Sequence, residues 1–344
     1  MRIKGLDVLR GIAILLVILR HGSIDNNAVK EFGWLGVDLF FVISGVLVSG
    51  LIFKEYLQLG TVNVKRFLIR RGFKIYPSFY FFMIFSIMFH WFHTHTMYDT
   101  RLILEEAFYI QNYTDGIWLH TWSLDVEEHF YIVLALFSLI AIRTKILYQT
   151  KTVIISLLLL LTVSFLLRCQ ASLPHRNESF FFIIKTHLRS DGLIIGVLIS
   201  YILHFTNWYQ QIQGKEKYIF IAGLALTLPG FLFNGGSFIM NTWGITVVNI
   251  GFGLITFIAI NYNPFPAIIY NIVNVPAKII SYIGKNSYSI YLWHITALNT
   301  VNFIFNYSKM VNFTMYFILS LFLGIALTYI IEKPFLRLRD RIIK

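Results

Sequence analysis

Long apolar stretches run through nearly the whole chain and are separated by short polar segments. A membrane-spanning helix needs about 20 mostly apolar residues in a row. Windows of this kind lie near residues 6–23, 34–53, 75–93, 122–142, 152–169, 180–203, 218–234, 243–260, 287–306 and 311–331. They predict an all-α fold, a polytopic membrane helix bundle with about ten transmembrane helices. Residues 1–344 are predicted to form one membrane domain with no appended soluble domain, and 264–286, which contains three prolines, an interfacial or re-entrant segment.

The composition fits a membrane protein. Hydrophobic residues make up 57% of the chain and charged residues 13%, whereas a typical soluble domain has about 25% charged residues. The formal net charge is +12, and the charges are clustered along the sequence. Six basic residues lie within 54–74 and five within 333–344, whereas 94–117 holds four acidic residues and one arginine.

This alternation of charge follows the positive-inside rule. It predicts that both termini and the connection 54–74 are cytoplasmic and that the connection 94–117 is outside. The excess positive charge then reflects topology and contact with anionic membrane lipids, so no nucleic-acid partner is expected. The predicted location is the cell membrane, as a multi-pass protein.

The first apolar window carries ionisable residues on one helical face. Arg10 and His21 are eleven residues apart, which leaves only about 20° beyond whole turns and separates them by about 16 Å along the axis. Asp7 precedes Arg10 by three residues, so the two side chains are within reach of each other. An arginine at the centre of a membrane helix costs about 2.5–3.5 kcal/mol on insertion scales. The stripe therefore predicts the wall of a polar cavity, with His21 at its outer end.

The window 122–142 opens with three carboxylates. Its outer end is at the level of His21, so a glutamate and this histidine are candidates for a general base and its orienting partner. The alternative is a helix start, where acidic residues are favoured by the helix dipole. Glu127 and Glu128 point about 100° apart. One of them, by slight preference Glu127, is predicted to face His21, and the other to meet a cation of the window 180–203, which contains Lys185 and Arg189.

Basic residues gather where the third window begins. Arg70, Arg71 and Lys74 are either a topology signal that contacts anionic lipid or a clamp for the phosphates of a nucleotide-bearing donor. Ser44 lies beside Gly45 in the second window. Helix packing explains this serine as well as a function does, and no adjacent base that would activate it as a nucleophile can be read from the sequence.

Two further groups are less specific. Three histidines lie within 90–95, but they lack the strict spacing of metal ligands, so no metal site is predicted. Tyr288, Tyr291 and His294 share a helical face by their three-residue spacing. Such an aromatic stripe is more typical of a core than of a functional site.

Several of these segments together resemble the integral-membrane acyltransferase family 3. The matching segments, in the family's order and spread over the whole chain, are LDVLRGIAILLVILRH, GWLGVDLFFVISG, RRGFKIYP, TWSLDVEEHFY, HLRSDGLIIG, GKNSYSIYLWH and IEKPFLRLRDR. Members of this family O-acylate sugars and antibiotics with acyl-CoA as the donor. The chain departs from the family at Lys74, where an arginine is usual, and in lacking the extracytoplasmic hydrolase-like domain that some members carry.

The resemblance implies where the donor binds. Acyl-CoA, most commonly acetyl-CoA, enters from the cytoplasm, and Arg70, Arg71 and Lys74 hold its phosphates. Ser44 is counted with these donor-binding residues. The thioester then reaches up between the first four helices, and no metal is needed.

The resemblance also implies a catalytic set. His21 acts as the general base on a hydroxyl of an extracytoplasmic or membrane-linked glycan, and Glu127 or Glu128 orients it. Arg10, paired with Asp7, stabilises charge near the thioester or lines the cavity. The membrane is then the bacterial inner or plasma membrane.

A transporter of a polar or anionic solute is the main alternative, because charged residues inside membrane helices also serve translocation. Transporters often have paired repeats or matched broken helices. The sequence shows no such pair, which favours the enzyme.

Overall fold

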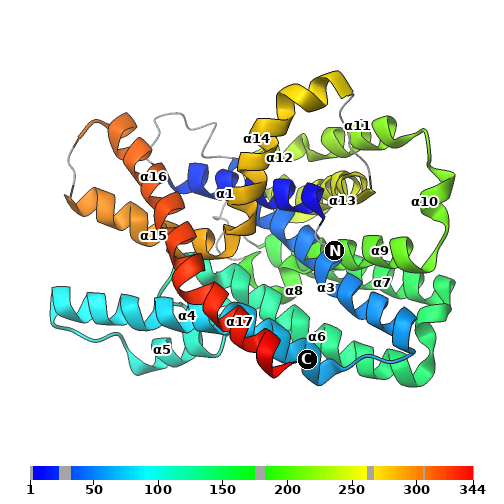
Figure 1. The fold of residues 1–344 in the computed structure, drawn as a ribbon, viewed down its shortest axis with the longest axis horizontal. Helices are drawn as coiled ribbons and strands as arrows, with labels where there is room; N and C mark the ends of the chain where they lie inside the picture. The colour runs from blue at the N-terminus through cyan, green and yellow to red at the C-terminus, as the bar shows by residue number, and fades with distance from the viewer. Residues whose placement is uncertain (1–2, 23–31, 175–182, 262–266, 305–306, 344) are drawn as a thin grey trace.

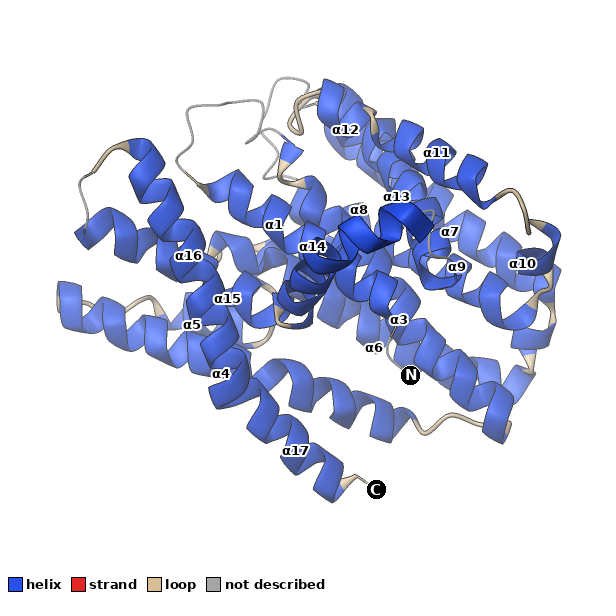
Figure 2. Ribbon diagram, turned by 45° about the horizontal axis from the view of Figure 1, so that its top comes forward, coloured by secondary structure: helices blue, strands red, loops and turns tan. Residues whose placement is uncertain are grey.

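The computed structural model describes residues 3–22, 32–174, 183–261, 267–304 and 307–343 (Figure 1). Within these ranges the regular elements are helices and no β-strand occurs (Figure 2). The α-helices are α1 (Lys4–His21), α3 (Leu35–Leu59), α4 (Val64–Thr94), α5 (Thr100–Ala107), α6 (Trp122–Thr144), α7 (Thr150–Ser172), α8 (Thr186–Arg189), α9 (Asp191–Phe205), α10 (Trp208–Gln211), α11 (Glu216–Thr227), α12 (Pro229–Leu232), α13 (Ile245–Asn261), α14 (Ala267–Lys285), α15 (Ser287–Ile304), α16 (Lys309–Leu327) and α17 (Lys333–Ile342). The short 3₁₀ segments η1 (Gln111–Tyr113), η2 (Leu119–Thr121) and η3 (Ile146–Tyr148) and the π segments η5 (Met240–Gly244) and η6 (Thr328–Glu332) complete them. The all-α prediction is confirmed.

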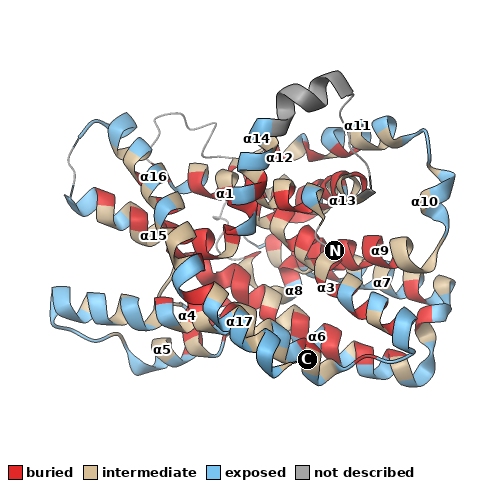
Figure 3. Cartoon of the chain, in the orientation of Figure 1, coloured by how far each residue is buried: buried red, intermediate tan, exposed pale blue. Residues whose placement is uncertain are grey.

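Several helices are long and apolar enough to cross a membrane. Among the described residues these candidate spans are Leu35–Leu59, Val64–Thr94, Thr150–Ser172, Met240–Ile260 and Lys309–Ile342. The helix α9 is apolar but shorter. Only 17% of the apolar window of α7 is buried, and many residues of the outer helices are coloured as exposed in Figure 3. Exposed apolar faces of this extent suit lipid rather than water. The count of about ten spans and the cytoplasmic termini stay predictions.

The helix α1 lies inside the bundle and packs against α14, α3, α13 and α15. Glycines allow the closest approaches. A Cβ atom on Gly284 of α14 would lie 1.9 Å from the carbonyl oxygen of Asp7, and one on Gly36 of α3 would lie 2.3 Å from that of Ala13. Backbones can approach this closely only where no side chain separates them. The helix that carries Arg10 and His21 is thus held on several sides.

The basic segment 54–74 is mostly helical, which corrects its interpretation as a connection. The helix α3 continues to Gly60, which closes it with a left-handed φ of 68°. After a short turn, the side chain of Asn63 accepts a hydrogen bond of 2.8 Å from the backbone N–H of Arg66. Asparagine is a favoured N-cap because it satisfies a free N–H of the first turn. The basic residues of 70–74 therefore lie on the first turns of α4.

The proline-containing segment 264–286 is described from Ala267 onward, where it forms α14. This helix continues through Pro276 and contacts α1. Pro264 and Pro266 lie outside the described residues, and the interfacial or re-entrant placement of the segment stays a prediction. Parts of three other predicted windows also lie outside them, at residues 23, 180–182 and 305–306.

Candidate active site

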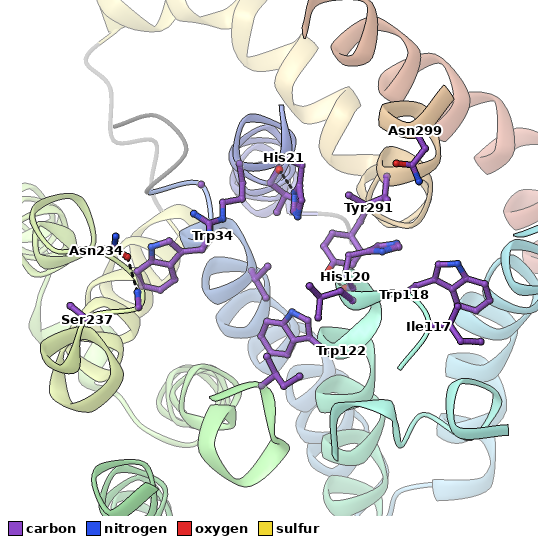
Figure 4. A pocket seen from close by; sticks show the side chains of 18 of the residues that line it. His21, Trp34, Ile117, Trp118, His120, Trp122, Asn234, Ser237, Tyr291 and Asn299 are labelled. Atoms are coloured by element: carbon purple, nitrogen blue, oxygen red, sulfur yellow. Dashed lines mark hydrogen bonds between the residues drawn. The ribbon is translucent and has the colours of Figure 1, made fainter. Parts of the chain in front are cut away.

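A cavity of about 1030 Å³ opens beside the C-terminal end of α1 (Figure 4). The aromatic side chains that line it are Trp34, Tyr98, Trp118, Trp122 and Tyr291. The polar side chains that line it are Arg20, His21, His120, Asn234, Ser237 and Asn299. Figure 4 shows Trp34 and Trp118 on opposite sides of the cavity. Flat rings combined with a few polar groups suit a ligand that has both apolar faces and polar edges.

His21 is exposed at the end of α1 and lines this cavity. Its Nδ1 atom lies 2.9 Å from the carbonyl oxygen of Val17 and 3.3 Å from Nε2 of His294. The two imidazole rings meet edge to face, with centroids 4.8 Å apart. His294 itself is fully buried on α15. The neighbours of the candidate base are therefore a backbone carbonyl and a second imidazole.

A second and smaller cavity, of about 60 Å³, adjoins the first, because Val37 and Tyr291 line both. Other residues that line it are Arg10, Ser44, Ser123, Glu127, Ser287 and Tyr288. In this cavity Oε1 of Glu127 accepts a hydrogen bond of 2.8 Å from Ser44, and Oε2 accepts one of 2.7 Å from Tyr131. The structure thus brings Glu127 together with Ser44 and Arg10. Among the described residues no hydrogen bond joins either glutamate to His21, so their predicted contact is not observed.

Arg10 is the cation of the second cavity. Its Nε atom donates a hydrogen bond of 3.2 Å to the hydroxyl of Ser287. The carboxylates in its surroundings are those of Glu127, Asp7 and Glu332. Asp7 is buried, as the predicted stripe on α1 requires. The pairing of Arg10 with Asp7 stays a prediction, and the structure adds Glu127 of α6 as a second acidic neighbour in the same cavity.

Glu128 has a different environment from that of its neighbour. It is buried, and its Oε2 atom accepts a hydrogen bond of 3.0 Å from the hydroxyl of Tyr76 on α4. The predicted partner Arg189 instead forms a buried ion pair of 3.0 Å with Asp38 of α3. The expected meeting of Glu128 with Arg189 is therefore wrong, because Glu128 faces α4 whereas Arg189 pairs with α3. For Lys185, the other predicted partner, no ion pair with Glu128 occurs within the part of the chain that the structure describes.

The three basic residues of α4 have separate surroundings. Arg70 is exposed, and the guanidinium of Arg71 lies 4.9 Å from the ring centroid of Tyr131. The ammonium group of Lys74 forms an ion pair with Glu332, whose second oxygen accepts a hydrogen bond of 3.1 Å from Ser289. The structure thus leaves the guanidinium groups near the surface and places Lys74 in a mostly buried contact with the C-terminal segment.

The connection between α5 and α6 forms part of the cavity wall. Oε1 of Glu106 accepts hydrogen bonds from the backbone N–H groups of Ile117 at 2.8 Å and of Trp118 at 2.9 Å, which hold this connection in place. Burial raises the pKa of Glu106 to about 7. Burial also lowers the pKa of His120 to about 3, so this imidazole is neutral near pH 7. Nε2 of His120 donates to the carbonyl oxygen of Leu292 at 3.2 Å.

The histidines of 90–95 have aromatic neighbours. The ring of His90 stacks on Tyr98 with centroids 4.0 Å apart, and that of His93 stacks on Phe89 at 6.3 Å. In the ranges that the structure describes, no group of three or more His, Cys, Asp or Glu side chains could hold a metal ion.

Several residues of this site cannot be found from the sequence pattern. The aromatic stripe places His294 in a core, and no motif singles out Glu106, His120 or the tryptophans and asparagines of the cavity wall. The three-residue spacing did place Tyr291 and His294 on one face of their helix, which is the signal that existed. The spacing within one helix does not show how α15 packs against α1, and this packing brings His294 to His21.

Comparison with known proteins identifies relatives over nearly the whole chain. Residues 3–333 match the model of a family described as an acyltransferase domain. A Staphylococcus aureus (strain COL) protein named "Putative O-acetyltransferase" is 29% identical over 372 aligned residues, which cover 97% of this chain and 57% of that protein. O-acetyltransferase OatA of Staphylococcus aureus (strain NCTC 8325 / PS 47) is 28% identical over 334 aligned residues, which cover 87% of this chain and 51% of OatA. The chain thus spans about half the length of the curated relatives it matches. No solved structure matches it significantly.

Proposed function

We propose that this chain, which belongs to the acyltransferase family, works as a membrane-bound O-acyltransferase. It moves an acyl group, acetyl by analogy with its relatives, from acyl-CoA on the cytoplasmic side to a hydroxyl of an extracytoplasmic or membrane-linked glycan. The observation that carries the proposal is the position of His21 in an aromatic-walled cavity. This cavity adjoins a second one that holds Arg10 and Glu127.

The larger cavity is suited to a saccharide acceptor. The faces of a sugar ring carry C–H groups, and its edges carry hydroxyl groups. Trp34, Trp118 and Trp122 offer flat apolar surfaces for such faces, and Asn234 and Asn299 offer amide groups for such edges. A cavity of about 1030 Å³ is at the upper end of the usual range of about 300–1,000 Å³ for ligand sites. It has room for one or two sugar units.

In the proposed chemical step, the proton is taken up by His21, which lines the cavity proposed for the glycan. Nε2 of His21 takes the hydroxyl proton of the glycan while the hydroxyl oxygen attacks the thioester carbonyl. The new C–O bond forms, the C–S bond breaks, and CoA leaves as the thiolate. The imidazolium of His21 then returns the proton to this thiolate, directly or through water, so that CoA is released as the thiol and the histidine is regenerated.

The pantetheine arm of acyl-CoA, which carries the thioester, is proposed to pass through the second cavity. This cavity lies at the level of Arg10, about 16 Å along α1 from His21, and it is too small in this structure for more than a slender chain. Hydrogen-bonding groups of Ser44 and Ser287 line it and are suited to the amides of a pantetheine arm. The charge of Glu127 keeps Arg10 oriented there. A side chain must move for the thioester to reach His21.

The phosphates of the donor are assigned to Arg70 and Arg71. Both lie in the N-terminal part of α4. The charge pattern predicts that this end of the helix is cytoplasmic. Guanidinium groups bind phosphate bidentately and remain charged at any physiological pH. The ammonium of Lys74 is paired with Glu332, so Lys74 contributes to the stability of this region rather than to phosphate binding. Residues 1–344 are proposed to act as one membrane domain in the cell membrane, with both termini on the cytoplasmic side.

Acyl transfer can be tested with the purified protein in proteoliposomes. The assay supplies [¹⁴C]acetyl-CoA together with a panel of hexose and hexosamine oligosaccharides and follows both free CoA and radiolabelled oligosaccharide. We expect CoA release that depends on the acceptor, and label on at least one oligosaccharide. His204→Leu is a suitable control variant, because His204 bonds only the backbone of its own helix in the described structure, at Ser200.

Three outcomes separate the alternatives. Label on an oligosaccharide supports the transferase. Uptake of an unmodified saccharide into the vesicles, without release of CoA, would favour the transporter. CoA release at the same rate with and without every acceptor would contradict transfer to a glycan.

A further inference from the structure

We infer that His294 is a positioning residue that fixes the protonation state of His21, so that Nε2 of His21 is free to accept a proton. The inference rests on the proposed function, in which His21 is the general base. Its basis is the pattern of hydrogen bonds among His21, His294 and two backbone carbonyls at the end of α1 and on α15.

The protonated nitrogen of His294 follows from its partner. Nδ1 of His294 lies 2.5 Å from the carbonyl oxygen of Tyr291. A carbonyl oxygen can only accept, so Nδ1 must carry the hydrogen. A neutral imidazole has one N–H group, and its other nitrogen is an acceptor. Nε2 of His294 is therefore an acceptor, and it faces Nδ1 of His21 at 3.3 Å.

The protonated nitrogen of His21 follows in turn. Its Nδ1 atom has two acceptors nearby, the carbonyl oxygen of Val17 at 2.9 Å and Nε2 of His294 at 3.3 Å. The hydrogen of His21 must lie on Nδ1, where both acceptors can share it. Nε2 of His21 is then left with a free lone pair on a side chain that lines the large cavity. A doubly protonated His294 would instead bring two N–H groups together.

His294 also supports the charged form that catalysis requires. When His21 accepts a proton, its Nδ1–H becomes part of a cation, and hydrogen bonds from cations are about twice as strong as neutral ones. Arg20 beside His21 opposes that charge. The ring of His120 packs edge to face against His294 at 5.3 Å. Burial lowers the pKa of His120 to about 3, so this imidazole adds no positive charge. Among the described residues no carboxylate hydrogen-bonds His21, and the neutral His294 takes the place that a carboxylate fills in many such sites.

The test compares three replacements of His294 in the proteoliposome assay with acetyl-CoA and the acetylated oligosaccharide. His294→Leu removes the acceptor and should lower kcat about 10–100-fold, the usual effect of losing a hydrogen bond to a charged group. KM for acetyl-CoA should stay unchanged. The acidic limb of the pH–rate profile should move to lower pH, because the imidazolium of His21 loses a stabilising partner. His204→Leu, at a histidine outside the site, is the matched control.

Two amide replacements keep the test decisive where the leucine variant fails to fold. His294→Gln places an oxygen near the position of Nε2, where it can accept from His21, and should recover most of the activity. His294→Asn reaches only to the position of Nδ1 and should not. Equal activity of Gln and Asn, or a leucine variant with the wild-type rate and pH profile, would overturn the inference. In either case the wild-type protein still transfers label, so the proposed function stands. A wild-type protein without transfer activity would reject that function instead.

Discussion

The hydroxyl of Ser44 donates a hydrogen bond of 2.8 Å to Oε1 of Glu127, which joins α3 to α6 at the level of Arg10. The hydroxyl of Tyr131 donates to the other carboxylate oxygen at 2.7 Å. Both donors are neutral, so the negative charge of Glu127 is left to act on Arg10. Glu128, one residue later, accepts from Tyr76 instead. Two adjacent glutamates therefore have separate partners and separate expected roles.

Glu127→Gln should lower acyl transfer about 10–100-fold while the protein still folds. The amide keeps an oxygen for only one of Ser44 and Tyr131 and removes the negative charge near Arg10. A hydrogen bond to a charged group contributes about 1.5–3 kcal/mol, which sets the expected size of the effect. Glu128→Gln is the matched control and should change the rate less than about threefold, because its oxygen can still accept from Tyr76. Specific activity per folded protein measures both. If both substitutions lowered specific activity equally and only mildly, the two glutamates would be better explained as acidic residues favoured at a helix start.

His21→Ala should reduce acyl transfer by about 10²–10⁴-fold, the usual contribution of a general base. The side chain is exposed at the helix end, so folding and membrane insertion should be unaffected. Size-exclusion profiles and thermal unfolding in detergent check this second point. Activity within a factor of two of the wild type would remove His21 from the catalytic role.

Replacing Arg70 and Arg71 by glutamine should raise KM for acyl-CoA more than it lowers kcat. This follows if both guanidinium groups hold phosphate equally in the ground state and in the transition state. Steady-state rates at varied acetyl-CoA concentration measure the split. An unchanged KM would leave these residues as topology signals.

Lys74→Met should act on stability rather than on donor binding. It leaves Glu332 buried without its cation, and removing one partner of a buried pair costs about 3–5 kcal/mol. The Lys74 side chain is 26% exposed, so a cost of about 2 kcal/mol is a better expectation once solvent screening is considered. The double variant Lys74→Met/Glu332→Gln should recover much of the lost thermal stability. A double variant no more stable than Lys74→Met alone would contradict the pairing.

Glu106 should make the folded protein less stable as the pH rises. Burial raises its folded-state pKa to about 7, above its value of about 4.5 in an unfolded chain. Its stabilising contribution is therefore fully present below about pH 4.5 and is lost as the pH rises through about 7, a change on the order of 3 kcal/mol.

The geometry around Glu106 agrees with a protonated carboxyl. The hydroxyl oxygen of Thr121 lies 2.5 Å from the carbonyl oxygen of Trp118, which accepts the one hydroxyl hydrogen. Oε2 of Glu106 lies 3.1 Å from the same hydroxyl oxygen and can then donate to it. Glu106→Gln reproduces this pattern without a titrating group. Thermal unfolding in detergent at pH 5 and pH 8 should show a fall in midpoint for the wild type and a much smaller fall for the variant. Parallel falls would reject the role of Glu106.

Sequence reasoning identified individual helices better than contacts between helices. The stripe of Asp7, Arg10 and His21 follows from the period of one helix, and the structure places Arg10 and His21 in adjoining cavities. The partner of Glu127 depends on how α6 packs against α1 and α3, and no spacing within one helix contains that information. The capping of α4 by Asn63 was readable in principle, because asparagine before a basic and apolar run is a helix-start signal. The buried pair of Arg189 with Asp38, 151 residues apart, was not.

Tyr291 has a consequence for how material crosses the protein. Its ring lines both cavities, and its hydroxyl donates to the carbonyl oxygen of His120 at 2.5 Å and bonds Ser123 at 2.7 Å. Under the proposed function, the nucleotide and the glycan can each stay on their own side of this partition. Only the thioester end of the donor has to pass Tyr291, and only its acyl group stays on the glycan. A membrane that stays sealed to both large substrates can thus still be crossed by the modification itself.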